Sequence, residues 1–161
     1  MSDRPDAAYE VGWYADVVGG FVDRLGLEDL DVVGHSYGGA VAQHLVLSRR
    51  ERVRTLALLA PGGWGRNVGI GLHALRVLPE WLLQPLLGAG TRLAFAAMAP
   101  ANAPHAEWLA SRPSSARALI RTARAAVDAR GARILASDFV DRLTELPPTL
   151  MLWGDRDRVL P

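Results

Sequence analysis

The chain has 161 residues, half of them hydrophobic, and its 18 basic and 17 acidic side chains leave a formal net charge of +1. This length suffices for one modest domain with a hydrophobic core, and the balanced charge lacks the basic footprint of a nucleic-acid-binding protein. The sequence has no cysteine, which excludes disulfides, a thiolate nucleophile and a cysteine-ligated metal. It also has no lysine, which excludes a Walker A motif.

No apolar run is long enough to span a bilayer, and the polar first residues lack the apolar centre of a signal peptide. We therefore expect a cytoplasmic protein that binds neither a membrane nor nucleic acid. No metal site and no cofactor are expected either.

The first predicted helix covers residues 7–25. Apolar side chains recur there every three or four residues, which makes one helical face. These side chains are Val11, Tyr14, Val18, Phe21 and Leu25. Gly26 is suited to the left-handed position that ends a helix, and a strand is predicted next, over residues 30–35.

That strand runs into Gly34-His35-Ser36-Tyr37-Gly38-Gly39, a G-x-S-x-G pattern between an apolar strand and a helix rich in small residues. The pattern is typical of a nucleophile elbow, in which a sharp turn strains the serine backbone and exposes its hydroxyl. We expect Gly34 and Gly38 to flank Ser36 because strand and helix pass too closely there for a β-carbon. The backbone N–H of Tyr37 is predicted to point where an oxyanion would form. The helix should extend to about Arg49.

A second buried strand is predicted over residues 53–60 and is ended by Pro61-Gly62-Gly63. Its nearly continuous apolar character is typical of a parallel sheet that is covered on both faces. A third buried strand is predicted over residues 149–153, before a polar loop that contains Asp155 and Asp157.

Residues 64–146 are rich in alanine, leucine and arginine and are interpreted as several helices. One should begin at an N-cap, Ser114 or Ser115, and extend to about Ala129. Another is expected around residues 139–143.

A connection of this length far exceeds a simple crossover between two strands, so it is interpreted as an inserted helical cap. The predicted organisation is a core at residues 1–63, the cap at residues 64–146, and the remaining core strand and loop at residues 147–161.

Three blocks of the sequence resemble the α/β-hydrolase superfamily, in particular its capped serine hydrolases. The blocks are the elbow at residues 30–39, the strand and turn at residues 56–65, and the strand and loop at residues 148–161. The resemblance extends over almost the whole chain and implies a partial α/β-hydrolase fold. That fold would have three parallel strands, flanking helices and an inserted helical cap.

The same resemblance implies a role for each candidate site residue. Ser36 would be the catalytic nucleophile, and the backbone N–H of Tyr37 would be an oxyanion donor. The triad acid, which orients a histidine, falls on Asp157, with Asp155 as the alternative. Either aspartate is also explained as a turn residue that binds its own backbone.

The family places a histidine after the acid, but no histidine follows His105 in this sequence. His35 should point away from the Ser36 hydroxyl, His44 lies too far along the elbow helix, and His73 and His105 belong to the predicted cap. The loop that supplies a second oxyanion donor should precede residue 1. We therefore expect a chain truncated at both ends and inactive as printed, because it lacks a general base.

The predicted function is that of a cofactor-independent serine hydrolase acting on an ester or related acyl bond of a small apolar substrate. A carbon–carbon bond hydrolase of aromatic degradation and a non-catalytic truncated chain remain alternatives. A haloalkane dehalogenase is not expected, because that chemistry uses an aspartate at the elbow, where this chain has Ser36. Self-association through unpaired sheet edges and marginal stability are also expected.

Overall fold

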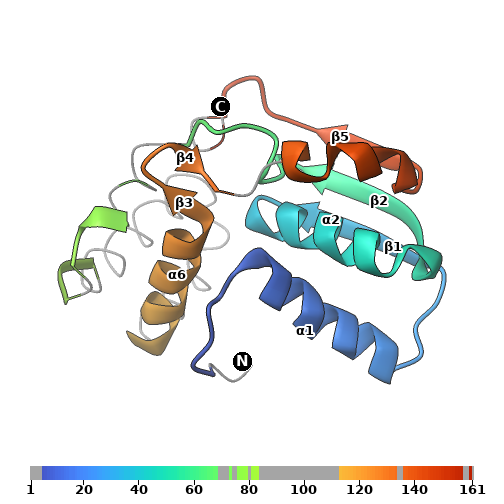
Figure 1. Cartoon of the computed structure of the whole chain (residues 1–161), viewed down its shortest axis with the longest axis horizontal. Coiled ribbons are helices and arrows are strands. Elements are labelled where there is room, and N and C mark those ends of the chain that lie inside the picture. Colours follow the sequence, from blue (N-terminus) through green and yellow to red (C-terminus); the bar gives the residue numbers. More distant parts are fainter. Residues whose placement is uncertain are drawn as a thin grey trace, which may run out of the picture.

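A parallel sheet forms the centre of the molecule. The computed structural model describes residues 5–68, 73, 76–79, 81–83, 113–133, 136–157 and 160. Within them the sheet has the strand order β1-β2-β5 (Figure 1). The strands are β1 at Leu30–His35, β2 at Val53–Leu59 and β5 at Thr149–Leu152. The three predicted strands are confirmed to within one residue, and β1 and β5 lie at the edges of the described sheet.

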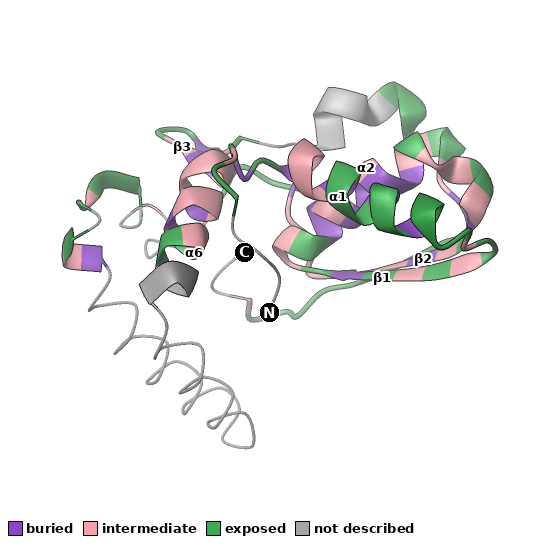
Figure 2. Ribbon diagram, turned by 90° about the horizontal axis from the view of Figure 1, so that it is seen from below, coloured by how far each residue is buried: buried purple, intermediate pink, exposed green. Residues whose placement is uncertain are grey.

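The helix α2 at Tyr37–Ser48 packs on one face of this sheet, and α1 at Val11–Arg24 packs against α2 on the same side (Figure 2). A 3-10 turn, η1 at Arg50–Arg52, joins α2 to β2. The buried cluster between α2 and the sheet consists of Ala42, Val46, Val53, Leu56 and Leu58. Alternation along β2 accounts for this cluster, because Leu56 and Leu58 project from the same side of the strand.

The helix α1 differs from its prediction in its start and in its buried face. It begins at Val11 because Tyr9 has a φ of 56° and Glu10 is extended. Its buried residues are Val11, Ala15, Gly19 and Val22. The predicted face was therefore wrong for Val18, Phe21 and Leu25, which are exposed. The small residues Ala15 and Gly19 form the middle of the buried stripe, between Val11 and Val22. Gly26, with a φ of 60°, has the predicted left-handed conformation.

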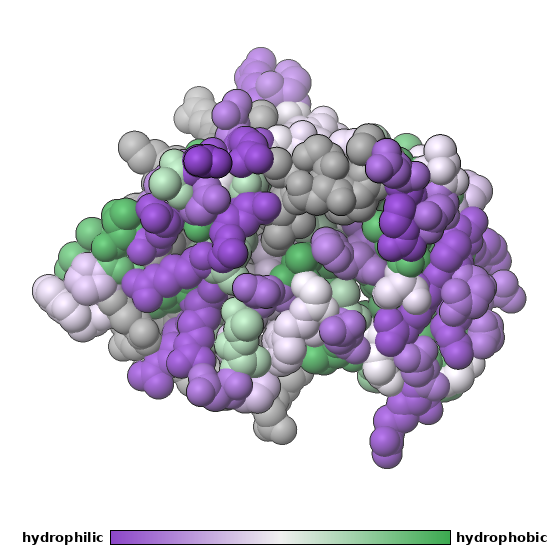
Figure 3. Space-filling model, in the orientation of Figure 1, coloured by the Kyte–Doolittle hydropathy of each residue, from purple (hydrophilic) through white to green (hydrophobic). Residues whose placement is uncertain are grey.

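The opposite face of the sheet carries exposed apolar side chains. Pairing aligns Val33 with Ala57 and Leu150, and His35 with Leu59 and Leu152. Val33 is 67% exposed, Leu150 56% and Leu152 52%. The prediction of a buried third strand in a sheet covered on both faces was therefore wrong for the described residues. The helices α1 and α2 lie on one side of the sheet, and all four residues of β5 are exposed, Met151 on the helical side included. The surface seen from the helical side is largely hydrophilic (Figure 3).

A second group of elements lies beyond the carboxyl ends of the strands (Figure 1). It comprises the helix α6 at Pro113–Ala126 and a short hairpin of β3 at Val127–Asp128 and β4 at Gly131–Ala132. The helix begins before Ser114 and Ser115, so neither is its N-cap, and it ends before the predicted Ala129. The hairpin replaces its last turn, with Gly131 at a φ of 113°.

Further along the chain, the predicted helix at residues 139–143 is a 3-10 helix, η3 at Ala136–Glu145. Two contacts hold α6 to the amino-terminal part of the chain. Arg121 Nη1 lies 2.6 Å from Asp6 Oδ1, and the hydroxyls of Tyr14 and Thr122 are 2.8 Å apart. The division of the chain into a core and a cap stays a prediction. Among the described residues, no helix has the length and apolar character needed to cross a bilayer.

Candidate active site

Ser36 occupies the turn between β1 and α2. Its φ of 52° and ψ of −125° lie outside the regions that non-glycine residues ordinarily adopt. The predicted backbone strain at this serine is therefore confirmed. The turn is held by a hydrogen bond from Ser36 N to Leu59 O, 3.0 Å long, and by Ser36 O, which accepts from Gly39 N and Gly62 N at 2.9 and 2.8 Å. Such strain persists when surrounding contacts enforce it, and it is concentrated at functional sites.

The glycines that pack closely around this turn are Gly34 and Gly39, whereas the predicted pair was Gly34 and Gly38. A β-carbon at Gly34 would lie 2.7 Å from Gly38 O, as expected. A β-carbon at Gly38 would meet nothing within 4 Å, so the prediction was wrong for that residue. Gly39 is the tight position instead, because its β-carbon would lie 2.6 Å from Pro61 Cβ. The helix thus closes on the turn after β2 one residue later than the motif suggests.

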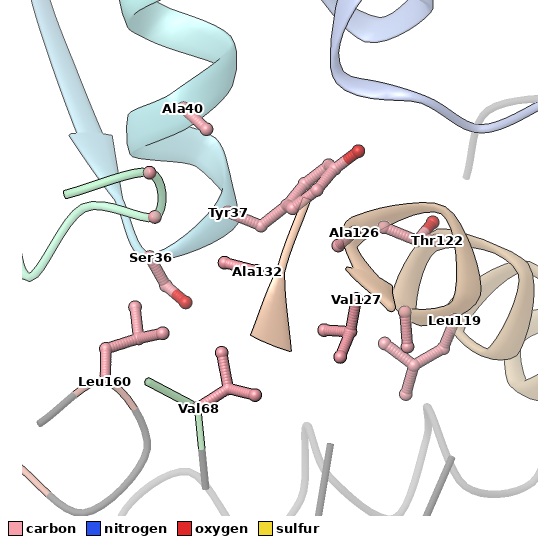
Figure 4. A pocket seen from close by; sticks show the side chains of 13 residues that line it. Ser36, Tyr37, Ala40, Val68, Leu119, Thr122, Ala126, Val127, Ala132 and Leu160 are labelled. Atoms are coloured by element: carbon pink, nitrogen blue, oxygen red, sulfur yellow. The ribbon is translucent and has the colours of Figure 1, made fainter. Parts of the chain in front are cut away.

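The side chain of Ser36 points into a cavity of about 210 Å³ (Figure 4). One wall comes from the elbow and from the turn after β2, and the other from α6 and its hairpin. The described residues that line it are Ser36, Tyr37, Ala40, Gly62, Gly63, Val68, Leu119, Thr122, Ala123, Ala126, Val127, Ala132 and Leu160. Most are apolar and none is charged, so the described wall suits an uncharged, apolar group.

Sequence reasoning did not identify the α6 wall. Its signal was the spacing of Leu119, Thr122, Ala123 and Ala126, which places four side chains on one face of a helix. The Thr122 hydroxyl donates to Ala118 O at 3.0 Å, besides its contact with Tyr14. It is therefore already paired within the protein.

Tyr37 contributes both its backbone and its ring to the site. Its amide is the first of α2, where N–H groups have no acceptor within the helix. Its hydroxyl donates to Tyr9 O at 3.2 Å, and its ring meets that of Tyr14 edge to face at 5.8 Å. Burial is the main cause that raises the pKa of the Tyr37 phenol, and the nearby Tyr14 and Glu10 raise it further. The phenol therefore stays protonated at neutral pH and serves packing.

The two candidate acids differ in their surroundings. Asp155 has a side chain that is 91% exposed and lies 3.9 Å from Arg156, which is a solvated surface pair. Asp157 is half-buried, and its Oδ1 accepts a hydrogen bond from Leu160 N at 3.0 Å. Leu160 lines the cavity, and its carbonyl accepts from Trp153 Nε1 at 2.9 Å. This hydrogen bond is the contact that the turn-residue alternative predicts, and it also ties Asp157 to a residue of the cavity wall.

The histidines are spread over several elements. His35 ends β1 and is exposed, and His44 lies on α2, two turns after Ser36. His73 is half-buried, and His105 lies outside the described residues. No histidine is among the described residues that line the cavity.

The chain is similar to known proteins in both sequence and fold. The sequence model of the Alpha/beta hydrolase family matches residues 1–161. An uncharacterized protein of Mycobacterium tuberculosis is 32% identical over 179 residues, a match that covers 100% of this chain and 52% of the relative. Haloalkane dehalogenase 2 of the same organism is 28% identical over 177 residues, covering 98% of this chain and 58% of the relative. The chain therefore spans about half the length of these two relatives.

A shorter match joins the chain to 2-hydroxymuconate semialdehyde hydrolase of a Pseudomonas species, with 39% identity over 75 residues, or 46% of this chain and 26% of the relative. Among solved structures, the esterase of Exiguobacterium antarcticum superposes with a TM-score of 0.72 and 24% identity, over 100% of this chain and 61% of the esterase. At that identity the likeness is one of fold.

Proposed function

Because the chain belongs to the alpha/beta hydrolase family, we propose that it carries the nucleophile of a serine hydrolase that acts on an ester or a related acyl bond. The observation that carries this proposal is the strained turn that directs the Ser36 hydroxyl into an apolar cavity. Membership of the family and its partial fold, both expected from the sequence, are confirmed by the family match and the parallel sheet.

In the proposed reaction, Ser36 Oγ attacks the carbonyl carbon of the substrate and forms a tetrahedral intermediate. The backbone N–H of Tyr37 donates a hydrogen bond to the resulting oxyanion. In enzymes of this kind, loss of one such donor slows turnover by about 100- to 1000-fold. Collapse of the intermediate expels the alcohol and leaves an acyl group on Ser36, which water then removes.

Proton transfer to and from Ser36 needs a base within hydrogen-bond reach. Asp157 is the proposed acid that would orient a histidine and stabilise its charged form. Its half-buried carboxylate favours it over the exposed Asp155. We assign the base to no described residue, since none of those lining the cavity is a histidine.

The mostly apolar lining of the cavity favours an apolar acyl group as the part of the substrate that binds next to Ser36. Leu119, Val127 and Leu160 are the larger side chains of its wall, and burial of apolar surface against them would contribute about 25 cal/mol per Å². A halide-displacing function is not supported, because attack by Ser36 on an alkyl halide would give a stable ether, whereas an aspartate gives an ester that water can hydrolyse.

A second candidate is hydrolysis of a carbon–carbon bond. The 39% identity to 2-hydroxymuconate semialdehyde hydrolase over 75 residues favours it. The test is incubation of the chain with imidazole as an added base, first with p-nitrophenyl esters and then with a 2-hydroxy-6-oxo-dienoate. Mass spectrometry after the ester incubation should find an acyl group on Ser36, and Ser36→Ala should abolish it. Turnover of the dienoate without acylation by esters would favour the second candidate, and no reaction with either would favour a non-catalytic chain.

A further inference from the structure

Gln43 is a buried amide on α2, two turns after Ser36. Its side chain is 1% exposed, and it is the buried polar residue of the described core. A buried amide without hydrogen bonds is costly, so its contacts indicate why a polar group occupies this position. Those contacts lead to the backbone of the elbow.

Gln43 and Ser36 are joined through the backbones of two glycines. Gly39 N and Gly62 N both donate to Ser36 O, at 2.9 and 2.8 Å. The carbonyls of the same two glycines both accept from Gln43 Nε2, at 3.0 and 3.4 Å. Each glycine therefore bridges the serine carbonyl and the glutamine amide, and the start of α2 is tied to the turn after β2.

The two turns that meet here are both strained. Ser36 has a φ of 52° and Ala60 a φ of 40°, and both are non-glycine residues. Conformations of this kind are unfavourable for non-glycine residues and need surrounding contacts to hold them. Gly62 also lines the cavity beside Ser36, so the position of the cavity wall relative to the hydroxyl depends on the same hydrogen bonds.

We propose that Gln43 is a positioning residue, which fixes the Ser36 turn against residues 61–63 by donating both of its side-chain hydrogens. Its catalytic significance rests on the proposed function. A primary amide provides two N–H groups on one neutral atom, which an isosteric methionine or carboxylate does not. Among the described residues, Gln43 Oε1 has no hydrogen-bond partner, so the contacts that hold this side chain come from its donors.

The first test compares Gln43→Met with Val46→Ala by amide hydrogen exchange. Val46 lies on the same helix in the core cluster and is fully buried, so its truncation destabilises α2 without touching the bridge. Gln43→Met should lower the protection of the Gly62 amide by about tenfold, because its local bridge is lost. Val46→Ala should lower the protection of the Gly62 amide only in proportion to the loss of global stability. Equal losses in both variants, or unchanged protection in Gln43→Met, would overturn the proposal.

Gln43→Glu tests the donor role through the protonation state of the side chain. A neutral carboxylic acid donates one hydrogen bond and a carboxylate donates none. Protection of the Gly62 amide in this variant should therefore fall as pH rises through the carboxyl's pKa, while the parent chain shows no such step. A flat pH profile of protection in Gln43→Glu would contradict the donor role.

The link to reactivity is measured separately, as the rate at which a fluorophosphonate modifies Ser36 in the presence of imidazole. Gln43→Met should slow the maximal rate by about tenfold and leave the half-saturating probe concentration unchanged, whereas Val46→Ala should retain the parent rate below its melting temperature. If the fluorophosphonate modified Gln43→Met as fast as the parent chain, the effect on reactivity would be refuted. If the parent chain itself is not modified, the proposed function fails, and hydrogen exchange still decides whether Gln43 holds the turn.

Discussion

Gly39 and Pro61 pack so closely that a β-carbon on residue 39 would lie 2.6 Å from Pro61 Cβ and 2.8 Å from Pro61 Cα. Residue 39 is in the first turn of α2, and residue 61 follows β2. The contact brings the helix that starts at Ser36 against the turn that forms one wall of the cavity. It explains why a second glycine follows the G-x-S-x-G pattern in this chain.

Gly39→Ala should destabilise the fold by about 2 kcal/mol, because the added methyl group must displace a proline backbone in a packed region. Gly38→Ala is the matched control, since its β-carbon would meet nothing within 4 Å. It should be neutral or stabilise the fold by up to about 1 kcal/mol through helix propensity. Urea denaturation of both variants measures the difference. Equal stabilities would refute the close approach at Gly39.

Ser36→Gly should be about 1 kcal/mol more stable than Ser36→Ala. Glycine tolerates the φ of 52° at this position, and part of that relief is offset by the greater chain entropy of glycine in the unfolded state. Both variants lack the hydroxyl, so their comparison isolates backbone strain from side-chain contacts. Thermal and chemical denaturation give the two free energies of unfolding. A less stable glycine variant would contradict strain at the elbow.

Asp31 should titrate with a lowered pKa. The hydrogen bond from Arg54 and then that from Thr55 lower the pKa of the Asp31 carboxyl to about 2 from the usual 3.8. A lowered pKa in the folded state stabilises the fold above the unfolded value, and this contribution is lost as pH falls from about 4 towards 2. Carboxyl chemical shifts in NMR measure the pKa directly. Arg54→Met should raise it, and an unchanged value would exclude Arg54 as its main cause.

The uncovered face of the sheet should promote self-association of this chain. Val33, Leu150 and Leu152 are exposed there, and β1 and β5 are the edge strands of the described sheet. Exposed apolar edges favour pairing with another chain. Sedimentation velocity should therefore detect oligomers that increase with concentration. Leu152→Lys should shift the chain towards monomer, whereas Phe21→Lys, at a similarly exposed apolar position on α1, should not. A monomer at all concentrations would contradict this prediction.

The strands and the elbow could be predicted because their signals are local. The apolar runs before Ser36 and before Pro61 specify strands, and glycine around a serine specifies a sharp turn. Burial is not local, since it depends on what lies above each face. β5 has the apolar composition of a buried strand, but all four of its residues are exposed, because the described helices leave it uncovered.

The cavity and the packing of α1 needed tertiary contacts. The apolar stripe through Phe21 suggested a buried face, but the helix turns its small residues Ala15 and Gly19 inward instead. The β3–β4 hairpin replaced the end of a predicted helix because Val127 pairs with Ala132 and Asp128 Oδ1 accepts from Arg130 N. The sequence does not distinguish Gln43 from an ordinary helix residue, because its hydrogen bonds to the carbonyls of Gly39 and Gly62 depend on the tertiary fold.

The most direct test of Ser36 as the nucleophile is labelling of the purified chain with a fluorophosphonate, with and without imidazole, beside Ser36→Ala. We predict slow labelling of the chain alone and acceleration of at least about tenfold by imidazole, which replaces the base that the described cavity wall lacks. Labelling should disappear in Ser36→Ala. Labelling that persists in Ser36→Ala, or its absence from a cooperatively folded chain supplied with imidazole, would contradict Ser36 as the nucleophile.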